Sequence, residues 1–197
     1  MMTRNVLWLF GLLFITIIHS CRQKDTLEQK ADDWYASLHD NQARIEVKIG
    51  DTEFYGQKSL FTGQVTLFED LFSTTLTDQF QGRMIISMGG KDWYRNKPII
   101  RKVVAENEIN ASVKMGKIID QKQMVGEGYM MADGQIEALT FTEDKIVLKI
   151  TGKAGKYSDF AAPDHYLPVE GLIVYKKPSI NTGGLSKEKV FGPNTSK

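Results

Sequence analysis

The residues best suited to acid–base or metal chemistry are few and scattered. Only two histidines lie beyond residue 20: His39, and His165 in the segment 163–166. Metal sites built on histidine bring several ligands at helix or strand spacing, as in H-E-x-x-H, and neither histidine has such neighbours. No G-x-S-x-G elbow presents a serine that His165 could activate. We therefore predict no catalytic residue, no metal site and no cofactor.

Two further patterns could support chemistry but have simpler interpretations. Gly89-Gly90-Lys91-Asp92 lacks the spacing of a phosphate-binding loop, so we expect a turn there. Pairs of carboxylates could converge for glycoside hydrolysis, because acidic residues are plentiful and distant pairs can meet in space. Acids on a solvated surface explain the same composition. An envelope hydrolase is therefore the third of our functional hypotheses.

Aromatic residues in predicted loops are the better candidates for binding. Trp93, Tyr94 and Arg95 follow the glycine pair, and a second group lies in the long connection before the last predicted strand. Aromatic rings beside polar groups suit a sugar or a protein partner, since rings stack on apolar faces and polar groups fix hydroxyls. The second group contributes Tyr157, His165 and Tyr166. The alternative is that these rings fill the core at the ends of a β-domain.

The elements that must position these loops are mostly short strands. From residue 42 onward, apolar residues alternate with polar ones, as in Ile45, Val47 and Ile49, which indicates half-buried strands. Turn signals recur every eight to twelve residues. This spacing predicts an all-β fold: one antiparallel β-sandwich or barrel of about nine or ten strands. The pair Asp133-Gly134 predicts the clearest hairpin turn.

Both ends of the chain are expected to differ from this pattern. Leu27, Ala31, Trp34 and Leu38 recur at helical spacing and predict one short N-terminal helix over 26–39. We assign the globular domain to 26–177. Residues 178–197 contain few apolar side chains and many loop formers, which predicts a flexible C-terminal tail.

The first 21 residues indicate export. Arg4 precedes an apolar run over 6–18, which is too short to cross a bilayer as a helix but suits a signal peptide, 1–20. The run ends in Ile18-His19-Ser20-Cys21, which resembles the lipobox of bacterial lipoproteins; His19 is bulkier than usual there. The resemblance implies cleavage before Cys21, diacylglycerol and palmitate on that cysteine, and a lipidated tether over 21–25. It also implies a cell-envelope location, with the outer membrane of a Gram-negative bacterium favoured because Arg22-Gln23 is not an aspartate start.

The amino-acid composition limits the kinds of partner that we expect. Without Arg4 the mature chain has 24 basic and 24 acidic side chains, and no basic stripe suits nucleic acid. Cys21 is the only cysteine, so the fold depends on its core rather than on a disulfide. We predict a non-catalytic, membrane-anchored module that binds an envelope protein or surface glycan. The alternative is a lipocalin-like carrier of a small apolar ligand, whose barrel interior would include Phe61, Val65, Met84, Ile86, Met130 and Ile146.

Overall fold

The computed structural model describes residues 26–105 and 110–192. The signal peptide, Cys21 and the tether lie outside these residues. The chain divides into two compact units between Ser37 and Leu38, and each is described by itself. In the first, residues 26–37 form the predicted helix, which ends two residues earlier than expected. Ser37 Oγ donates a hydrogen bond to the Trp34 carbonyl, 2.8 Å away, in the last turn.

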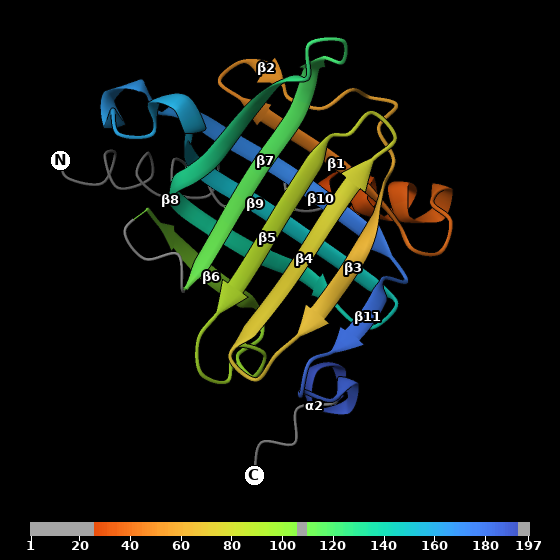
Figure 1. Cartoon of the computed structure of the whole chain (residues 1–197). Helices are drawn as coiled ribbons and strands as arrows, with labels where there is room; N and C mark the ends of the chain where they lie inside the picture. The colour runs from red at the N-terminus through yellow and green to blue at the C-terminus, as the bar shows by residue number, and fades with distance from the viewer. Residues whose placement is uncertain (1–25, 106–109, 193–197) are drawn as a thin grey trace, which may run out of the picture. The chain divides into compact units, whose positions relative to one another are not determined.

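The second unit contains a closed antiparallel barrel of eight strands. Strand β1 pairs with β10 on one edge and, at its start, with β3 on the other, which closes the ring. Figure 1 shows β3, β4, β5 and β7 crossing in front of β1, β10, β9 and β8. In ring order the strands are β1 (Gln42–Ile49), β3 (Phe61–Leu67), β4 (Leu71–Asp78), β5 (Arg83–Gly89), β7 (Ala111–Asp120), β8 (Val125–Phe141), β9 (Lys145–Lys156) and β10 (Leu167–Lys176).

Three short strands extend this ring. Within the described residues, β2 (Thr52–Glu53) pairs with β1, β6 (Ile99–Val104) with β8, and β11 (Ser179–Thr182) with β3. The all-β, antiparallel prediction is therefore confirmed for the ring, and closure decides between sandwich and barrel. The described chain has eleven strands rather than nine or ten.

The barrel interior is filled with apolar side chains from every strand of the ring. An eight-stranded barrel is just wide enough for side chains to fill it. Of the six residues predicted to face inward, five are almost fully buried: Phe61, Val65, Met84, Ile86 and Ile146. Met130 is only partly buried, because it alternates with the buried Tyr129 and Met131 and therefore points to the other face.

The predicted turn at Asp133-Gly134 is wrong. Both residues lie inside β8, where Gly134 is opposite Gly152 of β9 and Val103 of β6. A register shift between Met131 and Asp133 marks a bulge that bends the long strand, as at barrel corners. The bend lets one half of β8 pair with β7 and the other half with β6.

The predicted flexible C-terminal tail, 178–197, contains two regular elements among its described residues. Residues Ser179–Thr182 form β11, and Lys187–Phe191 form helix α2. Val190 is 1% exposed, and the Phe191 ring stacks on Phe141 with centroids 5.5 Å apart. Leu185 is also 1% exposed and β11 pairs with β3, so apolar contacts and strand pairing together hold this segment on the barrel. Residues 193–197 lie outside the described chain.

Candidate functional site

The hairpin formed by β7 and β8 extends past its neighbours. Strand β5 pairs with β7 only as far as Gly116, opposite Arg83, and β9 begins its pairing with β8 at Tyr129. Beyond these points, within the part of the chain that the structure describes, β7 and β8 pair only with each other, for example Lys117 with Glu127. The two strands therefore form an arm, whose turn projects at the top of the view in Figure 1.

A groove of about 790 Å³ lies at the base of this arm. One side is the turn end of the β4–β5 hairpin, which contributes Thr77 of β4, Gln81 of the turn and Arg83 of β5. The other side is the end of β9 and the short helix η1 (Tyr157–Asp159), where Tyr157 and Ser158 line the groove. The barrel thus brings together side chains from two turns that are far apart in the sequence.

Glycines form the floor of the groove. Gly116 and Gly128 are directly opposed on β7 and β8, and each alternates with a buried residue, Met115 and Tyr129 respectively. By the period of two they point away from the core. A Cβ on Gly128 would collide with the Tyr157 ring, whereas a Cβ on Gly116 would meet only the Glu127 carbonyl oxygen, 3.8 Å away. The Tyr157 ring therefore covers one glycine and leaves a hollow over the other.

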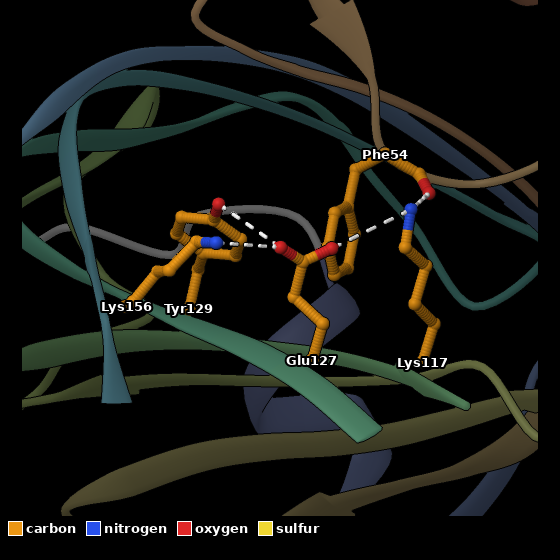
Figure 2. A network of polar contacts seen from close by, with 5 residues as sticks. All are labelled: Phe54, Lys117, Glu127, Tyr129 and Lys156. Atoms are coloured by element: carbon orange, nitrogen blue, oxygen red, sulfur yellow. Dashed lines mark hydrogen bonds and ion pairs between the residues drawn. The ribbon is translucent and has the colours of Figure 1, made fainter. Parts of the chain in front are cut away.

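A charged network lies at the base of the arm (Figure 2). The Glu127 carboxylate accepts a hydrogen bond from the Tyr129 hydroxyl at 3.3 Å and pairs with Lys156 Nζ at 3.0 Å and Lys117 Nζ at 3.9 Å. Lys117 also donates to the Phe54 carbonyl at 2.9 Å and lies over the Phe54 ring. These contacts fix the arm to β9 and to the segment that follows β2.

The network sets the charge state of its members. The hydrogen bond from Lys156 lowers the pKa of Glu127, and the same bond raises the pKa of Lys156. Burial raises the pKa of Tyr129. Near neutral pH the result is an ionised carboxylate between two ammonium groups, all three of which also line the groove.

Other polar side chains of the groove have no such partners. Within the described residues, the side chains of Thr77, Gln81, Arg83 and Ser158 make no hydrogen bond or ion pair with the protein. Arg83 is nonetheless held at its backbone, where its carbonyl accepts from the Tyr55 hydroxyl at 2.6 Å. The groove therefore presents one guanidinium, two hydroxyls and one amide to a ligand.

The structure buries two of the six predicted binding residues. Trp93 is 0% exposed, its indole N–H donates to the Phe68 carbonyl at 3.1 Å, and Tyr94 packs edge-on against it with 8% exposed. Both belong to the hydrophobic core, as in the alternative interpretation of the loop aromatics. As placed, they cannot contact an external partner. Arg95 is exposed and pairs with Asp92 at 3.1 Å.

The remaining three candidates all lie in the connection between β9 and β10, and one of them lines the groove. Tyr157 is half exposed and forms its wall. Tyr166 covers Gly155, and its hydroxyl donates to the Phe160 carbonyl at 2.7 Å. His165 Nδ1 is paired with Asp159, an interaction that raises the pKa of His165. Arg95 follows the Gly89 end of β5, about 20 Å of strand from the Arg83 end, so it is not part of this group.

Sequence reasoning missed the groove itself. None of Gln81, Arg83, Gly116, Gly126 and Gly128 was singled out as a candidate from the sequence. Single glycines inside strands mark places where another group approaches the backbone closely. Three of them within two adjoining strands were the available signal.

Among residues 26–105 and 110–192, no three His, Cys, Asp or Glu side chains gather to hold a metal ion, and no helix is long and apolar enough to span a membrane. Comparison with protein-family models, with curated proteins and with solved structures finds no significant match to this chain. The groove is therefore the feature from which we infer a function.

Proposed function

We propose that this chain is an envelope lipoprotein, anchored through lipid on Cys21, whose barrel binds a ligand without transforming it. The outer membrane of a Gram-negative bacterium is the proposed location. The observation that carries the binding proposal is the groove, where the side chains of Thr77, Gln81, Arg83 and Ser158 have no hydrogen-bond or ion-pair partner among the described residues. Concave sites with an aromatic wall and a few convergent polar groups are typical of ligand binding.

The electrostatics favour binding over acid–base catalysis. A general acid or base is most effective when its pKa is near the working pH. Glu127, the carboxylate that lines the groove, is shifted away from that range by Lys156. Its lowered pKa makes it a poor proton acceptor, and its two lysine partners hold it in place.

A lipocalin-like carrier is the second candidate, because the barrel is closed and has eight strands. In that proposal the ligand would occupy space inside the barrel, among residues such as Phe61 and Met84. Both are fully buried in one connected apolar core, which favours the external groove. Mass spectrometry of an organic extract of the purified protein tests this: a stoichiometric apolar molecule would favour the carrier.

Crosslinking in intact cells tests the binding proposal. Wild type should capture a defined envelope protein or glycan. Gly116→Leu, which projects a side chain into the hollow, should not capture this partner. Gly116→Ala is the matched control, since its Cβ fits without a clash. Equal capture by Gly116→Leu would contradict the proposal.

The anchor is tested separately. Wild type should incorporate labelled palmitate and sediment with membranes, whereas Cys21→Ala should do neither. Labelling of the Cys21→Ala variant would disprove the anchor at that residue.

A further inference from the structure

We infer that the groove recognises an acidic glycan, and specifically a carboxylate-bearing sugar between Tyr157 and Arg83. This inference rests on the proposed binding function and names the ligand class of the same site. Three properties of the groove lead to it: the shape of its floor, the chemistry of its polar groups and its charge.

The floor and wall suit a sugar ring. Gly116 exposes a flat stretch of backbone with open space above it, next to the half-exposed ring of Tyr157. A pyranose has an apolar face of C–H groups that packs against an aromatic ring, and it is flat enough to lie over a floor without side chains. Placing the sugar over Gly116 brings its edge beside Tyr157.

The polar groups suit hydroxyls. Thr77 and Ser158 each offer a hydroxyl that can donate and accept, and Gln81 offers a carboxamide that can do both. These groups come from the two opposite sides of the groove. A ligand with hydroxyls around its whole edge can satisfy both sides at once, which an aliphatic chain cannot.

The charge selects an acidic sugar. The groove is lined by three cationic side chains, Arg83, Lys117 and Lys156, and by one carboxylate, Glu127, a net balance of +2. The two lysines already pair with Glu127, whereas the Arg83 guanidinium has no partner within the described residues. A guanidinium forms paired hydrogen bonds with a carboxylate. Arg83 is therefore the group that would bind the acid.

The size of the groove sets the length of the ligand. Its volume of about 790 Å³ is in the range of sites that enclose a drug-sized molecule. A few sugar units fill such a space, so a short stretch of a longer chain would be bound. The ends of that chain would leave along the open face.

Calorimetric titration of the full-length, detergent-solubilised protein tests the inference. The probe is an oligogalacturonate, and the comparison ligands are its methyl ester, which lacks the charge, and an oligoglutamate, which lacks the rings. We expect the oligogalacturonate to bind, and both comparison ligands to bind at least about tenfold more weakly. Equal affinity for oligoglutamate, or no binding of the oligogalacturonate, would overturn the inference.

Four variants locate the binding. Arg83→Gln should weaken it about tenfold and reduce its salt dependence, Tyr157→Ala should weaken it to a similar extent, and Gly116→Leu should abolish it. Gly116→Ala should bind like wild type. Thermal unfolding of each variant identifies any that fails to fold. The binding site is then tested by comparing Gly116→Leu with Gly116→Ala. Full affinity in a folded Gly116→Leu variant would place the ligand elsewhere.

Together, the titration and the cell experiment distinguish an error in the ligand class from an error in the location of the binding site. If Gly116→Leu loses its partner in cells while the purified wild type ignores the oligogalacturonate, the binding function stands and the acidic glycan is wrong. If Gly116→Leu behaves like wild type in cells, the groove itself is not the site.

Discussion

Gly116 and Gly128 face each other across β7 and β8 and point the same way, yet only Gly128 is covered. The Tyr157 ring rests on Gly128, and no side chain of the described residues rests on Gly116. This asymmetry creates the hollow of the groove. It also makes the two glycines unequal in what they tolerate.

The first prediction uses this pair. Gly116→Ala should leave stability unchanged or raise it by about 0.5–1 kcal/mol, because alanine loses less backbone freedom on folding than glycine. Gly128→Ala should lower stability by about 1–3 kcal/mol, because its Cβ must displace the Tyr157 ring. Urea unfolding measures both. Adding Tyr157→Ala to Gly128→Ala should recover much of the loss, and the absence of any recovery would mean that the ring is not the obstacle.

The second prediction concerns Glu127 and pH. Its pKa is lowered in the folded protein, so its ion pairs stabilise the fold above the ordinary glutamate pKa of about 4.3 and lose this effect as the pH falls through the lowered pKa. Glu127→Gln should cost up to about 1 kcal/mol near neutral pH, because the network is partly solvated. The difference from wild type should vanish in acid. A difference that persists at low pH would show that the loss has another cause.

The third prediction concerns the connection that carries Tyr157. The pairing with Asp159 raises the pKa of His165, so the contact is fully present below the ordinary histidine pKa of about 6.5 and is lost as the pH rises through the raised value. Amides of 157–166 should therefore be better protected from hydrogen exchange at about pH 5.5 than at about pH 9, after correction for the intrinsic rate. Asp159→Asn should remove this dependence. An unchanged profile in Asp159→Asn would contradict the role of the pair.

The fourth prediction tests the bend in β8. Gly134 has φ of +136°, and a Cβ there would collide with the Thr151 carbonyl oxygen of β9. Gly134→Ala should destabilise the protein by more than about 2 kcal/mol. A turn residue in solvent would tolerate the change much better. Thermal unfolding beside Gly116→Ala, the glycine with open space, gives the comparison, and equal stability would argue for a turn.

The sequence by itself determined the local features. Alternation over 42–49 produced β1, and the helical spacing of Leu27, Ala31 and Trp34 produced a helix over 26–37. Such patterns are readable because one face of each element must be apolar wherever the chain runs. The sequence also lacks recognisable catalytic motifs. The expectation of a lipid anchor came from the sequence as well, and it concerns residues outside the described chain.

Only the tertiary structure decided how these elements close and which loops meet. Asp133-Gly134 has the composition of a hairpin turn, but pairing of β8 with both β6 and β9 outweighs that local preference. Trp93 belongs to a polar loop by sequence, yet it fills the core because the barrel leaves a space for it. Arg83 and Tyr157 are 74 residues apart, and they line one groove because β5 begins and β9 ends on either side of the same arm. Closure of a sheet is set by long-range pairing, which local sequence patterns do not encode.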